Sequence, residues 1–149
     1  MLRNNGFRPL DRQECLRLLA KVPVGRVVYT ERALPAVLPV NFSLDSDASV
    51  LLCAAVGSDL VRAIGGVVVA FEADEFDAEN RTGWSVVVTG RAAVVSDPEE
   101  HARLSQAGPR SWMPVGEPVF VRIESEMITG RELGRPDRPG DPRERRPDG

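Results

Sequence analysis

The sequence is poor in the side chains that most often carry catalysis or hold metals. Its 149 residues include one histidine, His101, and two cysteines, Cys15 and Cys53, at no spacing that suits a metal or a redox pair. His101 falls in an acid-capped amphipathic segment, which is typical of an ordinary surface or boundary histidine. We therefore predict no metal site. We expect both thiols to be reduced and to act as small apolar side chains in the cytosol.

Long apolar runs and an excess of positive charge are also missing. No segment approaches the roughly 20 apolar residues of a membrane-spanning helix, and the first nine residues contain no signal-peptide core. The formal net charge is −3 and Lys21 is the only lysine, whereas a surface that binds phosphate backbones has to be basic. These absences predict a cytoplasmic protein that binds neither a membrane nor nucleic acid.

Three common catalytic or nucleotide-binding motifs are absent as well. The chain contains no G-x-G-x-x-G after a strand, no G-x-x-x-x-G-K-[ST] and no G-x-S-x-G. A dinucleotide-binding βαβ unit, a P-loop and a nucleophile elbow are therefore excluded as readings of this chain.

The pattern that is present is mainly β. Helix caps and stops predict three short helices, beginning at Asp11, spanning Asp59–Ile64, and running from Asp97 to about Ala107. Apolar alternation and short apolar runs predict six strands: Gly25–Thr30, Ala36–Leu44, Ser49–Ala54, Val67–Ala73, Trp84–Ser96 and Val119–Ser125. Because the strands follow one another without a βαβ rhythm, we predict a closed or nearly closed antiparallel barrel with helices at its ends.

Prolines and glycines mark special points within these strands. Pro35 and Pro39 cannot donate to a ladder, so their strand should lie at an edge or contain a break. Gly90 interrupts the longest strand, where it predicts a bulge or a bend at which the sheet curls. The polar stretch Glu75–Gly83 is expected to be a loop.

The end of the chain differs in composition from the rest. Residues 134–149 contain only Arg, Asp, Glu, Pro and Gly. A segment without apolar side chains cannot bury enough surface to offset its ordering entropy. We therefore predict one domain over residues 1–133, followed by a disordered tail over 134–149.

Three segments combine small residues with groups suited to binding a ligand. Leu38–Phe42 contains a proline and the amide of Asn41, and Ala54–Asp59 places a Gly-Ser turn at a helix N-terminus, where free N–H groups favour a phosphate. Arg81–Ser85 puts an indole and a hydroxyl at the start of a strand. Each feature also has a purely structural interpretation. Pro39 would then only break an edge, Ser58 only cap a helix, and Trp84 only plug a barrel end.

The order of these segments resembles a known family. Leu38-Pro-Val-Asn-Phe42, a strand that ends in Gly57-Ser58, Val69-Ala-Phe-Glu-Ala-Asp74 and Gly83-Trp-Ser-Val-Val-Val-Thr-Gly-Arg91 look like the pyridoxamine 5′-phosphate oxidase-like flavin-binding proteins. Among these, the chain is most similar to small actinobacterial members related to nitroimidazole-resistance proteins. The resemblance covers about Leu10 to Leu133.

The resemblance implies a six-stranded antiparallel split β-barrel that forms a homodimer, with flavin mononucleotide (FMN) in two equivalent clefts at the interface. Some members of the family use the deazaflavin F420, and a few bind haem. Carried over by position, Pro39, Val40 and Asn41 would line the isoalloxazine edge, and Trp84 and Ser85 would close the site. The ribityl phosphate would lie on the turn and the helix that follows it, formed by Ala55, Val56, Gly57, Ser58 and Asp59, with Arg62 one turn further along.

One position departs from the family pattern. Relatives commonly read Gly-Ser-Lys where this chain has Gly57-Ser58-Asp59, and an aspartate repels a phosphate that a lysine would attract. Arg62 or Arg91 is available to compensate. The favoured reading is a flavin-dependent oxidoreductase whose substrate the sequence does not specify. The alternatives are an F420-dependent reductase on the same scaffold, and a non-catalytic dimeric barrel that has lost its cofactor, which Asp59 favours.

Overall fold

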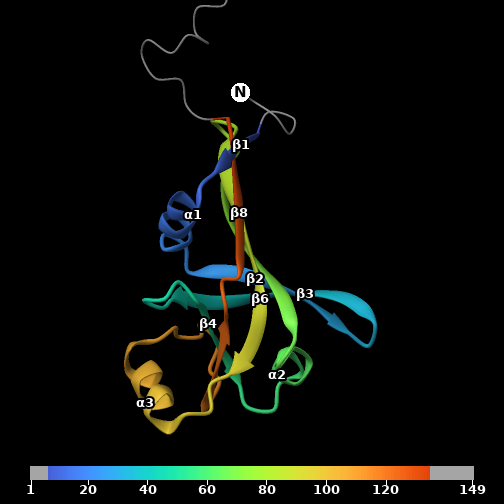
Figure 1. Cartoon of the computed structure of the whole chain (residues 1–149), viewed down its shortest axis with the longest axis vertical. Helices are drawn as coiled ribbons and strands as arrows, with labels where there is room; N and C mark the ends of the chain where they lie inside the picture. Colours follow the sequence, from blue (N-terminus) through green and yellow to red (C-terminus); the bar gives the residue numbers. More distant parts are fainter. Residues whose placement is uncertain (1–6, 135–149) are drawn as a thin grey trace, which may run out of the picture.

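The computed structural model describes residues 7–134, in which eight strands and three short helices form one β-rich unit (Figure 1). The strands are β1 (Phe7–Leu10), β2 (Val24–Glu31), β3 (Leu34–Leu44), β4 (Val50–Ala55), β5 (Val68–Asp77), β6 (Thr82–Val94), β7 (Pro118–Ile123) and β8 (Met127–Leu133). The helices are α1 (Arg12–Leu19), α2 (Asp59–Ile64) and α3 (Pro98–Ala107). None of these helices has the length and the apolar character needed to cross a membrane.

Six of the strands close into an antiparallel barrel. The hydrogen-bonded order is β6-β5-β2-β3-β4-β7, and a β6–β7 pairing joins the two ends. These are the six strands predicted from the sequence, so the predicted six-stranded split barrel is confirmed. The sheet continues past the barrel, because β8 pairs with the first half of β6 and β1 pairs with β8 (Figure 1).

The barrel interior holds a single main core. Val27, Phe71 and Val88 are fully buried, and the rings of Phe42 and Phe71 meet edge to face with centroids 4.7 Å apart. Cys15 and Leu19 of α1 and Leu60 and Ile64 of α2 belong to the same cluster. The helices therefore cover the two ends of the packed sheet. The smaller cluster under α3 contains Leu51, Cys53, Leu104 and Phe120.

Two parts of the sheet were not predicted. The expected polar loop Glu75–Gly83 is wrong, because β5 and β6 stay paired as far as Asp77 and Thr82. Strands β1 and β8 were not predicted at all, since their side chains are largely polar or half-exposed. In both places the backbone ladder continues although few apolar side chains mark it, because antiparallel hydrogen bonds do not depend on side-chain polarity.

The special points within the strands behave as expected. The first part of β3, Leu34–Asn41, pairs only with β2, and pairing with β4 begins at Phe42, so of the two predicted alternatives for Pro35 and Pro39, an edge or a break, the edge is confirmed. Gly90 lies where β6 passes from β8 to β7, and a Cβ added there would stand 1.6 Å from the carbonyl oxygen of Glu124. Only glycine allows this close approach of two backbones.

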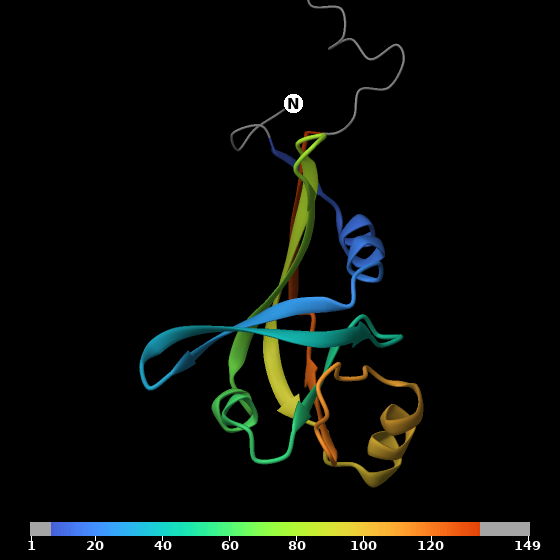
Figure 2. The same ribbon diagram turned by 180° about the vertical axis from the view of Figure 1, so that it is seen from behind.

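The β2–β3 hairpin extends beyond the barrel as an arm, seen from both sides in Figures 1 and 2. Its turn residues, Arg32 and Ala33, have φ of 51° and 64°, which is the two-residue type I′ geometry. Leu34 and Val37 on this arm are 67% and 61% exposed, so the arm presents apolar surface to its surroundings. The predicted disordered tail over 134–149 lies, apart from Gly134, outside the described residues.

Candidate functional site

Three of the residues assigned to the isoalloxazine site share one face of the barrel wall. In the antiparallel register Pro39 pairs with Arg26, Arg26 with Glu72, and Asp74 with Ser85, so Pro39, Asn41 and Ser85 all point to the outer face of β3, β5 and β6. Val40 points to the other face and packs against the core. Within one chain, this outer face is where the predicted ring site can form.

A row of polar and charged groups crosses this outer face, and only one of its members, Ser85, is among the site residues predicted from the sequence. The Arg26 guanidinium lies 3.0 Å from Glu72 and 3.3 Å from Asp74, and the hydroxyl of Ser85 donates to Glu72 at 3.2 Å. We call Arg26, Glu72, Asp74 and Ser85 the polar row. A sequence signal existed, because Glu72 and Asp74 are acids at outward-facing positions that follow the apolar first part of the strand.

The electrostatics of the polar row centre on Glu72. Burial, reinforced by the neighbouring carboxylate of Asp74, raises the pKa of Glu72, although Arg26 and Ser85 act in the opposite direction. The side chain of Glu72 is 24% exposed, whereas that of Arg26 is 43% exposed. Glu72 is therefore a partly desolvated acceptor held in place by two donors.

An opening in the ladder adjoins Pro39 and Asn41. Strands β3 and β4 pair only through Phe42–Leu44, and if that register continued, Ala55 would stand opposite Pro39. The amide of Asn41 is engaged on both sides, since it donates to the carbonyl of Pro23 at 3.3 Å and accepts from the backbone N–H of Trp112 at 2.8 Å. Asn41 thus ties β3 to the loop after α3, and it does so beside the opening.

The predicted phosphate turn lies at the far side of this opening. Gly57 has φ of +70° and open space around its Cβ position, and the hydroxyl of Ser58 caps α2 by accepting from the N–H of Val61 at 3.4 Å. Val56 is 68% exposed. Asp59 forms an ion pair with Arg62, and the same guanidinium donates to the carbonyl of Gly57. The aspartate that departs from the family pattern therefore offsets the nearest arginine.

Within one chain, Trp84 belongs neither to the outer face of the barrel wall nor to the phosphate turn. Its indole is buried on the inner face, and its strand neighbours in the ladder are Glu75 and Glu132. Helix α2 lies near the other end of β6, because the N–H of Gly66, just after α2, donates to the carbonyl of Ala92. Ala92 is eight residues beyond Trp84 along β6, which at about 3.3 Å per residue is a separation of roughly 26 Å. Arg91, the other arginine considered for the phosphate, donates to the carbonyl of Gly66 at 2.6 Å.

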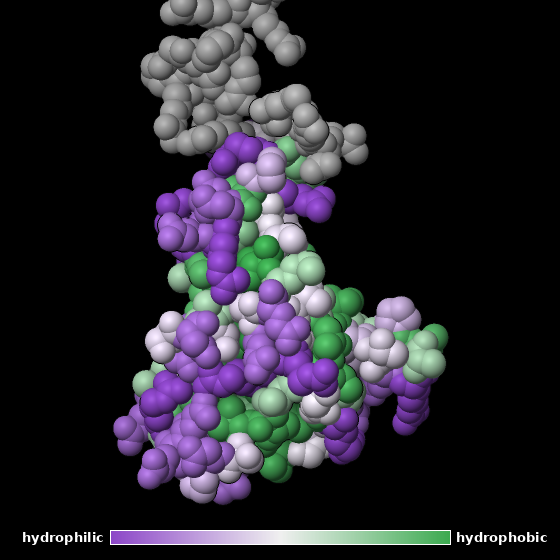
Figure 3. Space-filling model, viewed as in Figure 1, coloured by the Kyte–Doolittle hydropathy of each residue, from purple (hydrophilic) through white to green (hydrophobic). Residues whose placement is uncertain are grey.

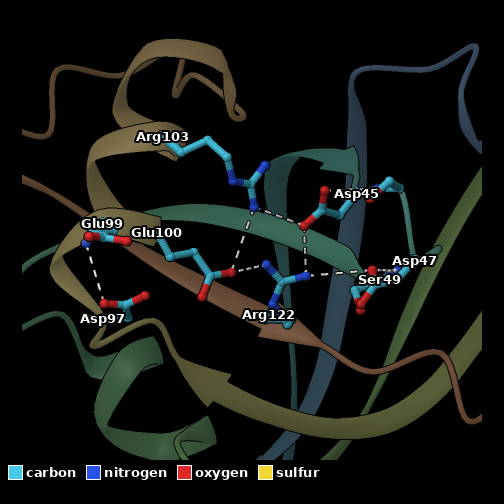
Figure 4. A network of polar contacts seen from close by, with 9 residues as sticks. Asp45, Asp47, Ser49, Asp97, Glu99, Glu100, Arg103 and Arg122 are labelled. Atoms are coloured by element: carbon cyan, nitrogen blue, oxygen red, sulfur yellow. Dashed lines mark hydrogen bonds and ion pairs between the residues drawn. The ribbon is translucent and has the colours of Figure 1, made fainter.

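A cluster of five charged side chains lies elsewhere, on the side covered by α3 (Figure 4). Arg122 contacts Asp45 at 2.9 Å and Asp47 at 3.5 Å and also pairs with Glu100, and Arg103 reaches Asp45 at 3.1 Å. These groups satisfy one another and join the β3–β4 turn to α3 and β7. His101 packs on Phe120 with ring centroids 5.4 Å apart. This side of the barrel serves stability.

The fold and the outward-facing site define a split β-barrel protein. Residues 11–132 match the family model described as pyridoxamine 5′-phosphate oxidase, and the chain belongs to this family. The family predicted from the sequence pattern is thereby confirmed.

Three relatives illustrate the similarity. The chain is 51% identical over 127 residues to an uncharacterized protein of Mycobacterium tuberculosis, which covers 81% of this chain and 82% of the relative. An FAD-binding protein from Mycobacterium smegmatis is 33% identical with a TM-score of 0.67, over 86% of this chain and 99% of the other. A conserved protein of unknown function from Corynebacterium diphtheriae is 34% identical with a TM-score of 0.72, over 87% and 99%.

Proposed function

We propose that this protein binds a flavin on the outer face of its barrel wall and acts as a flavin-dependent oxidoreductase on a small molecule. The observation that carries the proposal is the common face of Pro39 and Asn41 of β3, which the family pattern assigns to the ring, and Ser85 of β6, which it assigns to closing the site. The FAD-binding relative from Mycobacterium smegmatis, 33% identical over most of both chains, supports a flavin as the ligand class.

The residues present fit such a group. Gly57 leaves the backbone of the phosphate turn open, and the first N–H groups of α2 have no partner within the helix. The polar row offers donors and acceptors to a polar ring edge. When bound, the flavin supplies the hydride chemistry, while the chain's own residues bind the ring, orient it and exclude water.

FMN is the flavin that we propose first, because the turn at Gly57 offers one phosphate site. FAD and F420 carry larger groups beyond that phosphate, and an F420-dependent reductase on this scaffold remains the second candidate. The pairing of Asp59 with Arg62 also supports the third reading, a barrel that has lost its cofactor. The substrate and the cytoplasmic location remain predictions from the sequence.

Titration with FMN, FAD and F420 tests the proposal, and the variant Asp59→Lys tests the position of the phosphate. We expect the wild-type protein to quench FMN fluorescence, and we expect Asp59→Lys to tighten FMN binding by about tenfold at low salt. The substitution replaces a negative by a positive charge and frees Arg62 from its ion pair, and solvent screening limits the gain because Asp59 is 75% exposed.

Two controls isolate the phosphate. Riboflavin, which lacks the phosphate, should bind wild type and Asp59→Lys equally. Glu99→Lys makes the same charge change in the first turn of α3 and should leave FMN affinity unchanged. If no flavin binds and no Soret band of haem appears, the reading as an empty barrel is correct. If Asp59→Lys also binds riboflavin more tightly than the wild type does, the phosphate does not lie at this turn.

We also propose that the protein is a homodimer. Val28, Val37 and Val68 lie on the same outer face as the polar row and are 37%, 61% and 54% exposed. Apolar surface also runs down the barrel part of the molecule next to the base of the arm (Figure 3). A second copy would bury this surface. Sedimentation velocity at micromolar concentration should show a dimer, and a monomer there would contradict the proposal.

A further inference from the structure

The polar row lies where it can form hydrogen bonds with one particular part of a flavin. We propose that Arg26, Glu72 and Ser85 recognise the uracil-like edge of the isoalloxazine ring, an inference that rests on the flavin-binding function proposed above. The three residues come from β2, β5 and β6, and Arg26 is the direct ladder partner of Pro39, the residue assigned to the ring.

The hydrogen-bonding pattern of the row matches that edge. The edge presents a carbonyl oxygen, the N3–H donor and a second carbonyl oxygen, so it requires a donor, an acceptor and a donor from the protein. Arg26 supplies N–H donors, Glu72 a carboxylate acceptor and Ser85 a hydroxyl donor. Within the row, Arg26 and Ser85 both donate to Glu72, at 3.0 and 3.2 Å, which orders the three groups before any ligand arrives. Arg26 has further N–H groups for a ligand, whereas the single hydroxyl proton of Ser85 turns from Glu72 to the ligand carbonyl on binding.

The charge of this surface suits a neutral group. Arg26 is balanced by Glu72, and the second carboxylate, Asp74, lies within 3.3 Å of the same guanidinium. Arg131 of β8 is the ladder partner of Ser85 and adds a second positive charge on this side of the sheet. Two cations and two anions leave no net charge, as expected for a site that binds the uncharged ring while a separate turn holds the phosphate.

Burial separates this row from an ordinary surface ion pair. Glu72 and Asp74 are 24% and 27% exposed although they lie on the outer face, and burial raises the pKa of Glu72. A partly desolvated carboxylate forms strong hydrogen bonds to a donor that replaces water. The N3–H of a flavin is such a donor.

A change in the ligand tests this role without any change in the protein. In 3-methyl-FMN a methyl group replaces the N3 hydrogen, while the phosphate and the rest of the ring are unchanged. We expect the wild-type protein to bind 3-methyl-FMN at least about tenfold more weakly than FMN, because the Glu72 acceptor loses its donor and meets a methyl group. The readout is quenching of flavin fluorescence, which requires no substrate.

Matched variants assign the effect to the row. Glu72→Leu should weaken FMN binding and abolish the preference for FMN over 3-methyl-FMN. Ser85→Ala should weaken FMN binding by about three- to tenfold. Thr89→Val serves as the control, because Thr89 lies on the same face of β6, opposite Ala70, and outside the row. It should leave both affinities unchanged, and circular dichroism establishes that each variant is folded.

The outcomes are distinguishable from those that test the proposed function. If the wild type binds FMN and 3-methyl-FMN equally well, the edge is not read by this row, and the inference fails while flavin binding stands. If folded Ser85→Ala binds FMN as tightly as Thr89→Val, the assignment to the row fails as well. If the wild type binds no flavin at all, both the proposed function and the inference are overturned.

Discussion

Gly90→Ala is expected to destabilise the protein by at least about 3 kcal/mol, and it should leave little folded protein at 37 °C. The added Cβ would stand 1.6 Å from the carbonyl oxygen of Glu124, at the point where β6 leaves β8 and joins β7. The Cβ would be fixed by the paired backbone of β6, and the Glu124 carbonyl belongs to a backbone segment held by hydrogen bonds to Arg91 and Glu126, so neither can turn away as a side chain would. The barrel closes through this crossing, and a local shift would disturb the β6–β7 pairing that completes it.

Thermal and urea denaturation of Gly90→Ala and of a matched control measure this effect. Gly65→Ala adds the same methyl group where the nearest heavy atoms lie at 3.5 and 3.9 Å, which is ordinary van der Waals contact. The control should change stability by less than about 1 kcal/mol. Equal melting temperatures for the two variants would show that the crossing at Gly90 is not tightly packed.

Asp45→Asn is expected to cost about 2 kcal/mol at neutral pH, and this cost should shrink as the pH falls. Burial opposes ionisation of Asp45, but the N–H of Ser46 and the guanidinium groups of Arg122 and Arg103 outweigh it, and the pKa falls from 3.8 to about 2 (Figure 4). A pKa difference of this size corresponds to about 2 kcal/mol of folding free energy, and the side chain is only 14% exposed.

The direction of the pH dependence follows from the lowered pKa. Between about pH 4 and pH 2 the unfolded chain binds a proton at this position that the folded chain does not, so stability rises with pH across this window. The contribution of Asp45 is therefore complete above about pH 5 and is lost as the pH falls through 2. Asparagine does not titrate, so the difference between wild type and variant should be largest above pH 5.

Denaturation midpoints from pH 3 to pH 7 check this prediction. Glu117→Gln removes an exposed carboxylate outside the network and serves as the matched control, with a change below about 0.5 kcal/mol at every pH. A difference between wild type and Asp45→Asn that does not vary with pH would mean that the charge of Asp45 contributes nothing to the stability of the barrel.

Local signals were sufficient for most of the architecture. The N-caps and stops located the three helices to within a residue or two, since Asp11, Ser58 and Asp97 act as N-caps through their own side chains. The six barrel strands carry alternating or continuous apolar residues, the prolines of β3 mark the part of that strand that lies at an edge, and Gly90 of β6 marks a crossing. Each of these features acts on its immediate neighbours, so it is visible in the chain.

The parts that were missed depend on partners far along the sequence. Strand β8 forms because the first half of β6 offers it a ladder, and β5 runs on to Asp77 because β6 pairs with it to the end. Neither the half-exposed residues of β8 nor the acids of β5 stand out as strand residues alone. Their conformation is set by the partner strand, whose hydrogen-bonding groups must be satisfied.

The candidate site shows the same division. The family, the barrel and the alternation that puts Pro39 and Asn41 on the face opposite Val40 could all be predicted from the sequence, because motifs and strand periodicity are local properties. The meeting of Arg26, Glu72 and Ser85 could not be predicted, since it depends on the ladder register between β2, β5 and β6, which brings them within hydrogen-bond distance. The tertiary structure also decided that Asp59 pairs with Arg62 and that Trp84 faces inward, far from Gly57. Strand register and burial depend on the packing of the whole sheet, so they cannot be predicted from any single segment of the chain.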